Sequence, residues 1–382
     1  MVDNPFQANV IASEFQIRDK SMKYAVNGSA GVSIRGADVK EKGLYSNIGI
    51  NKNSGKFRFG FSETINSDKY NPNDLGYLRR NNEIISDAYF SYQILQPVGE
   101  IMEFTSRLYW KNIRIYYPSD IYNSEIEIGS SLRLRNNYHF YLNTGYGSDR
   151  HDYFETRVKN RYLFEPYQLW LMLNMDTDRR KPLSVGINYM GFIQPVSGQR
   201  SNRLEAIIDA RIGQHVKIDY ESGLNNRIDD LGFIDKTSNE DTIYFAKRNI
   251  KALENGLRVH YALTPGTGIN LRIRHYWSAA LNKNFYQLQD DGFLKDDFSY
   301  VENKDENYNA FNVDLMYKWV FAPGSEISVL WTNSEFENTN IVNYNYWENF
   351  NRTLKTNRIN SFSIKVLYYI DYNYLKRKKF SN

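Results

Sequence analysis

The residues of this chain that are able to do chemistry are mostly charged side chains at every second position of apolar stretches. Between Glu125 and Arg135, for example, acidic and basic residues alternate with Ile126, Ile128 and Leu132. Successive side chains of a β-strand point to opposite faces, so this pattern predicts strands with one apolar and one charged face. Such charges either pair across neighbouring strands or line a pore that selects solutes. The candidates for this charged, lumen-facing surface are Glu125, Glu127, Arg133, Arg203, Glu205, Asp209, Lys217, Asp219, Arg258, Arg272, Arg274, Asp314 and Lys318.

Histidine is the next candidate for chemistry, because it serves as a general base in many catalytic triads. None of the five histidines has the serine or carboxylate spacing that marks a triad, although sequence does not show which residues meet in space. Gly-x-Ser-x-Gly, His-Glu-x-x-His and Walker patterns are also absent from the sequence. We therefore predict no catalytic residues and no enzyme. The histidines are His139, His151, His215, His260 and His275.

Two acidic stretches contain the oxygen ligands that calcium prefers, but neither has the spacing of an EF-hand loop. The chain has no cysteine, which excludes thiolate metal sites and cysteine nucleophiles. We therefore predict no metal site and no cofactor, and interpret both stretches as solvated loops. Their acidic residues are Asp229, Asp230, Asp235, Glu240 and Asp241, then Asp290, Asp291, Asp296 and Asp297.

The elements that position the charges are clearest between residues 309 and 338. Phe311, Leu315 and Trp319 belong to an aromatic and aliphatic set at every second position, and polar residues occupy many of the positions between them. Residues 323–325, Pro-Gly-Ser, predict a tight turn, after which Ile327 resumes the same alternation. The phase is kept across the turn, as the register of a hairpin requires when one face must stay in one medium.

The rest of the chain repeats this unit. Short turns near residues 20, 54, 98, 136, 180, 213, 266 and 324 alternate with long polar loops, and the strands between them are about ten to thirteen residues long. Outer-membrane barrels combine short periplasmic turns with long extracellular loops. A soluble β-sandwich is the alternative, but its strands average only about five or six residues.

The composition agrees with a barrel that shows lipid only one face. Aromatic residues make up 15% of the chain, although its mean hydropathy is −0.62. There is no apolar run of about eighteen residues, which excludes a helical membrane protein. The formal net charge of +4 is too weak to indicate nucleic acid, and the basic run at residues 376–379 is interpreted as a solvated tail.

These patterns predict an all-β fold, namely a large antiparallel transmembrane β-barrel of about 16–18 strands with short periplasmic turns and long extracellular loops. We expect residues 1–382 to form one such domain, integral to a bacterial outer membrane. Its expected partners are outer-membrane lipid and lipopolysaccharide, with protein subunits and a glycan bound through the loops as further options.

The number of strands leads to a separate expectation. Eight short turns join about sixteen strands, and a last strand at residues 361–374 makes about seventeen, whereas bacterial single-chain barrels use an even number. No signal peptide is visible at residues 1–5. We therefore expect either that at least one strand precedes this chain in a longer protein, or that residues 9–18 are not a barrel strand.

The chain contains several short motifs, namely Tyr70–Gly76, Tyr153–Glu155 with Arg161-Tyr162, Asp229–Gly232, Arg274–Trp277 with Gln287–Gly292, Phe321–Glu326 and Leu367–Tyr372. These motifs resemble those of the domain of unknown function 5916, a C-terminal barrel region. The resemblance covers nearly the whole chain and implies a barrel, without an established activity or catalytic residues. Full-length members usually carry a preceding β-sandwich that is similar to carbohydrate-binding family nine, and this sequence lacks it.

Three functions are consistent with these observations. Transport, a channel or membrane assembly comes first, and a barrel that anchors a glycan- or protein-binding module comes second. An outer-membrane hydrolase is third, because it would need a triad on the barrel wall. Aromatic residues of one loop either stack on sugars, pack on one another, or join an interfacial belt. They are Tyr344, Tyr346, Trp347 and Phe350.

Overall fold

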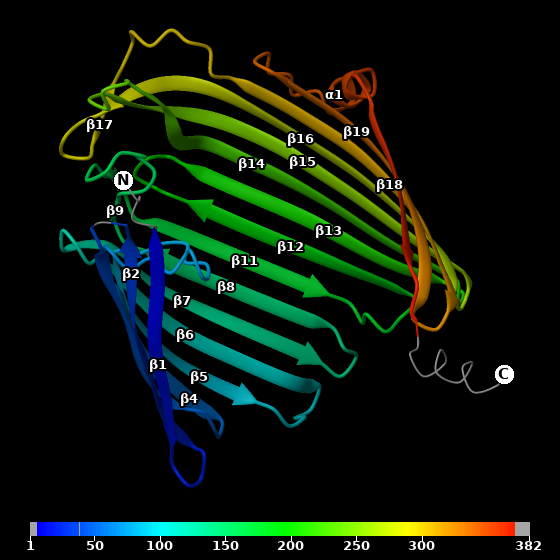
Figure 1. The fold of residues 1–382 in the computed structure, drawn as a ribbon, viewed down its shortest axis with the longest axis horizontal. Helices are drawn as coiled ribbons and strands as arrows, with labels where there is room; N and C mark the ends of the chain where they lie inside the picture. The colour runs from blue at the N-terminus through cyan, green and yellow to red at the C-terminus, as the bar shows by residue number, and fades with distance from the viewer. Residues whose placement is uncertain (1–5, 38, 371–382) are drawn as a thin grey trace, which may run out of the picture.

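The computed structural model describes residues 6–37 and 39–370 and consists mainly of one curled, antiparallel sheet of 18 strands (Figure 1). This confirms the predicted all-β fold. A separate two-stranded sheet is formed by β9 and β10. The elements are β1 (Gln7–Arg18), β2 (Tyr24–Gly36), β3 (Glu41–Lys52), β4 (Phe57–Asn66), β5 (Glu83–Ile94), β6 (Ile101–Ile115), β7 (Asp120–Leu134), β8 (His139–Gly147), β9 (Arg150–Asp152), β10 (Leu163–Glu165), β11 (Gln168–Asp176), β12 (Leu183–Ile193), β13 (Arg200–Ile212), β14 (Val216–Lys236), β15 (Ile243–Thr264), β16 (Thr267–Leu288), β17 (Leu294–Asp296), β18 (Glu306–Ala322), β19 (Ser325–Thr339), α1 (Tyr346–Thr353) and β20 (Ile359–Leu367).

The long strands follow one another around the wall in chain order. Each pairs antiparallel with the long strand before it and the one after it, and β8 pairs directly with β11 across the segment that contains β9 and β10. The 18-stranded sheet includes the three-residue β17, so the described residues contain 17 long strands. No helix among residues 6–37 and 39–370 is both long and apolar enough to cross a membrane.

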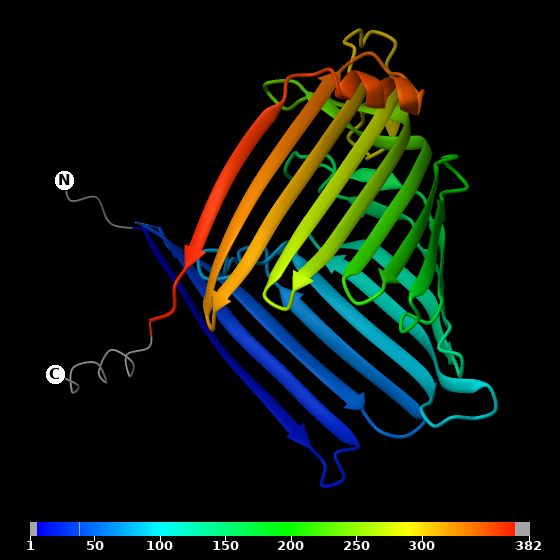
Figure 2. The same ribbon diagram turned by 90° about the vertical axis from the view of Figure 1, so that its right-hand side faces the viewer.

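Alternation gives the sheet two chemically different faces. Trp319, Ile327 and Val366 are register partners across β18, β19 and β20, so they share a face. Phe350 of α1 packs beside Phe311 on that face, and both ribbon views place α1 on the outer side of the curled sheet (Figures 1 and 2). The apolar face is therefore the convex one. Phe311, Leu315, Trp319 and Ile327, which the alternation predicted on one face, all lie on it, and Val329, Phe362 and Val366 lie on it too.

All eight predicted short turns connect consecutive strands at one end of the sheet, the short-turn end. Asn137 has a φ of 60° and Gly324 a φ of 72°, so both turns use the left-handed region that asparagine tolerates and glycine favours. At the other end, the long-loop end, the alternation is less regular than predicted. The β6–β7 connection there has only residues 116–119, because Ile115 and Asp120 are still register partners.

Seven strands are longer than the predicted ten to thirteen residues: β6, β7 and β19 have 15 residues each, β18 has 17, and β14, β15 and β16 are longer still. β14 has 21 residues, and β15 and β16 have 22 each. Beyond the apolar band they arch over toward β9 (Figure 1). There Leu163 of β10 joins Ile243, Phe245 and Leu288 in a buried apolar cluster. The extra length is used to build this cluster at the long-loop end, which we call the outer cap.

The last strand is shorter than predicted. β20 ends at Leu367 rather than at residue 374, because its partner β19 begins at Ser325 and Glu326↔Leu367 is the final register pair. Tyr369 still donates its backbone N–H to the Ser325 Oγ at 3.0 Å, but Tyr368–Ile370 are outside the ladder. The remaining predicted positions, 371–374, lie outside the described residues.

The sheet has two free edges among the described residues. β1 pairs there with β2 alone, and β20 pairs with β19 alone. β1 runs toward the first short turn, and β20 ends beside the β18–β19 turn, so both run toward the short-turn end. Figure 2 shows these edges, β1 in dark blue and β20 in red, as the sides of an opening in the wall. We call this opening the seam.

Candidate functional site

The concave face carries the charges that the sequence pattern predicted for one face. All thirteen candidates lie on long strands, in the phase opposite to the apolar band. Five of them form a single cross-strand line, which we call the central row, at register positions Asp209↔Asp219↔Arg258↔Arg272↔Asp314 on β13, β14, β15, β16 and β18. Two carboxylates therefore lie beside two guanidinium groups and a third carboxylate at one level of the wall.

Three members of the central row bind an ion-pair partner that lies two residues along a strand from the row. The Lys217 Nζ lies 2.7 Å from an Asp219 carboxylate oxygen, and Arg258 lies 2.9 Å from Glu221. Arg274 pairs with Asp314 at 3.0 Å. Within the described part of the chain, Arg272 forms no ion pair. Its guanidinium is thus the cation of the row that has no ion-pair partner among the described residues.

The other candidates also have polar partners on the same face. Arg203 pairs with Glu254 at 2.9 Å and with Glu205 at 3.7 Å. Arg133 pairs with Glu103 and Lys318 with Glu326, each at 2.6 Å. The remaining two candidates, Glu125 and Glu127, have Lys111 and Tyr109 of β6 as their register partners.

One of the histidines meets a serine and a carboxylate, which the sequence did not indicate. His139 Nε2 lies 2.9 Å from the Ser131 Oγ, and His139 Nδ1 lies 3.9 Å from an Asp176 oxygen. The second distance is too long for a hydrogen bond. Asp176 instead accepts a hydrogen bond from Arg179 at 2.8 Å. The carboxylate therefore does not orient the imidazole as a catalytic triad requires.

The polar row of β14 leads along the wall into a cavity of about 440 Å³ at the long-loop end, which we call the outer cavity. Lys217, Asp219, Glu221, Asn225 and Arg227 occupy the concave phase of β14 from the short-turn end to this cavity. Three arginines and four carboxylates are among the residues that line it, so its charges nearly cancel. The lining residues are Arg150, Asp152, Glu155, Glu165, Gln168, Phe192, Gln199, Arg227, Asp230, Leu231 and Arg248.

Two ion pairs hold the walls of the outer cavity together. Arg248 Nε lies 3.0 Å from Asp230, which joins β15 to β14. Arg150 Nε donates to Glu165 at 3.0 Å, which joins β9 to β10. Burial raises the pKa of Glu165, against the opposing effect of Arg150. Burial alone would lower the pKa of Arg150, but the adjacent Glu165 carboxylate raises it overall.

The outer cap lies beside this cavity, since Leu231 belongs to both, and it joins segments that are distant in the sequence. Phe164 stacks on Phe293 with ring centroids 4.7 Å apart, and the Phe164 backbone N–H donates to the Gly292 carbonyl at 2.8 Å. The Phe233 backbone N–H donates to the Glu155 carboxylate at 3.1 Å. The loop between β8 and β11 is thereby fixed to the tips of β14 and β16.

The interpretation of the acidic stretches as solvated loops is wrong for Asp229, Asp230 and Asp235, which lie in β14, and Asp230 is buried. Several of the acidic residues pair with basic side chains. Asp229 pairs with Lys283 at 3.0 Å, Asp235 with Lys304 at 3.1 Å, and Asp290 with Arg161 at 3.3 Å. Hydrogen bonds from Ser299 and Gln287 lower the pKa of Asp297. Within the described residues, no group of three or more histidine or acidic side chains is arranged to hold a metal ion.

The aromatic residues of the β19–β20 loop do not share one environment. Tyr346 and Phe350 pack against His275, with ring centroids 5.3 and 5.0 Å away. Trp347 remains 67% exposed, and Tyr344 is 42% exposed. Of the three options from the sequence, packing therefore describes Tyr346 and Phe350, whereas Trp347 faces the surroundings.

The sequence analysis named Asp230 of the outer cavity as part of an acidic stretch, but it missed the arginines and Glu165. Arg227 continues the alternation of Lys217 and Asp219, so extending that phase by a few residues would have found it. Arg150 and Glu165 carry no such signal, because they flank a loop whose folding alone brings them together.

Comparison with known proteins identifies the family. The family model described as Domain of unknown function (DUF5916) matches residues 2–379. The chain belongs to this family. The resemblance expected from the short motifs is therefore confirmed for DUF5916. No curated protein matches the chain.

Two solved structures contain a sheet that is distantly similar to this DUF5916 barrel. A point mutant of the ferric enterobactin receptor PfeA from Pseudomonas aeruginosa is 7% identical, with a TM-score of 0.43 over 94% of this chain and 69% of that one. The siderophore receptor PirA from Acinetobacter baumannii is 6% identical, with a TM-score of 0.43 over 94% of this chain and 71% of that one. At this distance the similarity carries no argument about function.

Proposed function

We propose that this DUF5916 protein lies in a bacterial outer membrane and passes small polar solutes through its lumen. The observation that carries the proposal is the continuous polar track on the concave face, from Lys217 near the short-turn end to Arg227 in the outer cavity. Facing lipid at mid-depth, each arginine or lysine would cost about 2–4 kcal/mol. A wall of this many strands encloses a lumen too wide for side chains to fill, so these charges face water.

The charge pattern favours solutes that carry both donors and acceptors. In the outer cavity three arginines are set against four carboxylates, so neither a strong anion nor a strong cation is preferred. In the central row, the like-charged pair Asp209 and Asp219 lies beside the like-charged pair Arg258 and Arg272. Such a row produces a field across the lumen, which orients polar and zwitterionic molecules.

The two alternative functions, an anchor or scaffold and a hydrolase, require different features of the barrel wall. A barrel that serves as an anchor or scaffold needs no open lumen and binds its partner, a glycan or a protein, through the loops. A hydrolase needs an oriented Ser-His-Asp set, and the 3.9 Å separation between His139 and Asp176 does not provide one. The polar track therefore supports solute passage best.

The test measures ion conductance of the protein, purified from its native membrane, in planar bilayers. We expect steady conductance, and we expect Arg272→Glu to shift the reversal potential toward greater cation selectivity. Arg272 is the position of choice because its replacement breaks no ion pair among the described residues. Lys69→Glu is the matched control, since it makes the same charge change at an exposed site in the β4–β5 loop.

Silent bilayers from protein with an intact fold would overturn solute passage and favour the scaffold function, in which loop deletions abolish partner binding. Equal shifts from the Arg272 and Lys69 variants would also overturn the proposed role of the central row, because they would show a general effect of net charge.

A further inference from the structure

Helix α1 has an unusual distribution of side chains for a helix in water, because its two fully buried residues are polar and its tryptophan is exposed. The residues that it buries are Asn349 and Thr353, whereas Trp347 is 67% exposed. A water-exposed helix normally buries its apolar side and shows its polar side. Tyr346 and Phe350 also pack toward the wall, and Glu348 and Asn351 are exposed beside Trp347. An outer side with one tryptophan among polar residues fits a helix that meets an interfacial medium.

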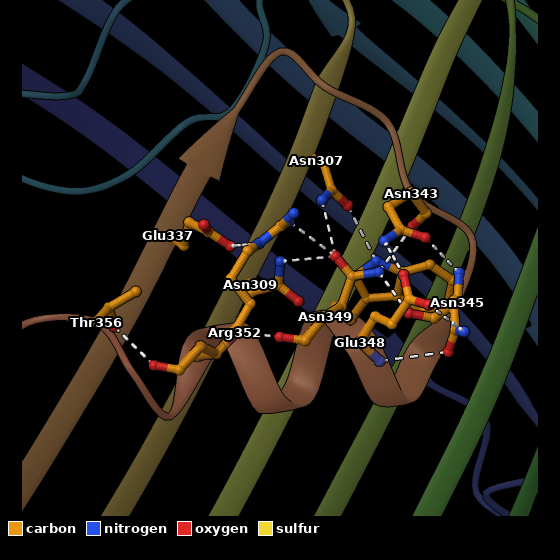
Figure 3. A network of polar contacts seen from close by, with 11 residues as sticks. Asn307, Asn309, Glu337, Asn343, Asn345, Glu348, Asn349, Arg352 and Thr356 are labelled. Carbon is orange, nitrogen blue, oxygen red and sulfur yellow. Dashed lines mark hydrogen bonds and ion pairs between the residues drawn. The ribbon is translucent and has the colours of Figure 1, made fainter.

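The polar side is bound to the wall by a network centred on Asn349 (Figure 3). The Asn349 Oδ1 accepts hydrogen bonds from Asn307 at 2.8 Å, Asn309 at 3.3 Å and Arg352 at 3.1 Å. Its Nδ2 donates to the Asn345 backbone carbonyl at 2.8 Å. Both wall asparagines are fully buried, so α1 is fixed to β18.

The helix lies where the convex apolar band ends. On β18, Leu315, Val313 and Phe311 belong to the band, and the next two positions of the same phase are Asn309 and Asn307, which α1 covers. The Phe350 ring of α1 is 5.8 Å from the Phe311 ring at the edge of the band. Figures 2 and 3 show α1 crossing the strands rather than following them. The helix therefore extends along the boundary of the band.

We propose that α1 is an interfacial helix whose partner is the lipid of the leaflet at the long-loop end, with Trp347 in the headgroup layer. The inference rests on the proposed membrane location of the barrel. Tryptophan suits this layer because its ring is largely apolar and its N–H is polar. The hydrogen bonds of Asn349 fix the helix to the wall. A helix that is fixed in this way and lies in the interface holds the barrel at a constant depth in the bilayer.

The experiment measures tryptophan fluorescence of the whole protein in nanodiscs that contain one copy each. The contribution of Trp347 is the difference between the wild type and Trp347→Phe, and that of Trp319, in the apolar band, is obtained from Trp319→Phe. We expect the emission of Trp347 to be blue-shifted from that of tryptophan in water. A headgroup nitroxide lipid should quench it more strongly than aqueous iodide does. Mid-chain brominated lipid should quench Trp319 instead.

The other occupants of this surface have distinct outcomes, and each would overturn the inference. Strong quenching of Trp347 by iodide alone would show a water-exposed helix, and protection from iodide by an added soluble glycan would show a sugar site. Protection only in discs with two copies would show a self-association surface. If Trp319 is quenched by brominated lipid in these cases, the membrane location stands; if neither tryptophan responds to lipid, both proposals fall.

Discussion

At the residue scale, the polar groups of this protein act in sets rather than singly. Arg272 has no ion-pair partner among the described residues, because Asp314, its register partner, is engaged by Arg274 at 3.0 Å. Asn349 uses its carbonyl oxygen for three donors at once. A buried amide that loses its hydrogen-bond partner has been removed from water without a replacement hydrogen bond, which destabilises the folded state.

Replacing the Asn349 amide therefore tests whether its hydrogen bonds fix α1 to the wall. Asn349→Ala leaves the buried amides of Asn307 and Asn309 without their acceptor, and we expect the free energy of local opening of α1 to fall by about 1–3 kcal/mol. Hydrogen exchange of the peptide around residues 343–356 measures this. Asn351→Ala is the control, because Asn351 lies on the exposed side of the same helix. Equal loss of protection in both variants would contradict the assigned role.

At the element scale, each strand separates an apolar convex face from a polar concave one. The partners Tyr317↔Val329 and Lys318↔Ser328 occupy adjacent steps of the same hairpin and opposite faces of the sheet. Because the two faces meet different media, substitutions one residue apart have different consequences.

The hairpin offers a matched pair for testing the lipid boundary. Val329→Arg places a charge on the band and should cost about 2–4 kcal/mol of folding free energy in a bilayer, whereas Ser328→Arg faces the lumen and should cost little. Val366→Arg and Lys365→Arg form the corresponding pair on β20. The folded fraction in liposomes, read from heat-modified mobility on gels, gives the comparison. Equal folding of Val329→Arg and Ser328→Arg would show that the convex face does not meet lipid.

At the scale of the whole molecule, the seam leaves the backbone groups of β1 and β20 unpaired on one side of each strand within the described part of the chain. Unpaired backbone groups within lipid cost several kcal/mol each, so a membrane barrel does not leave an edge open. β1 and β20 run in the same direction, and a second copy inserted the same way round presents edges of that same direction. An antiparallel closure therefore needs a strand that runs from the short-turn end to the long-loop end.

We predict that such a strand lies against β1 in the native membrane. Hydrogen exchange should then show strong protection for those β1 amides, within residues 7–18, that do not bond to β2. The same amides should exchange freely when residues 1–382 are refolded alone. Rapid exchange of these amides in the native membrane would refute the prediction, and equal protection in both preparations would indicate that β1 and β20 close the wall by themselves.

The sequence by itself determined most of the wall of this protein. Strand alternation has a period of two, and turns at Asn137 and Gly324 depend on local backbone preferences, so both are visible within a few residues. These local signals correctly placed the eight short turns and the apolar face. They did not reveal the ends of β14–β16, because strand length past the band is set by what the strand packs against.

Only the tertiary structure decided which loop residues meet. Leu163 and Ile243 are 80 positions apart in the sequence and share the outer cap, and Arg150 meets Glu165 only when β9 pairs with β10. Asn349 becomes the centre of a network only because α1 folds back over Asn307. The alternation within a strand shows which face of the sheet each side chain occupies. The environment of a loop residue instead depends on distant segments, and no short stretch of sequence contains that information.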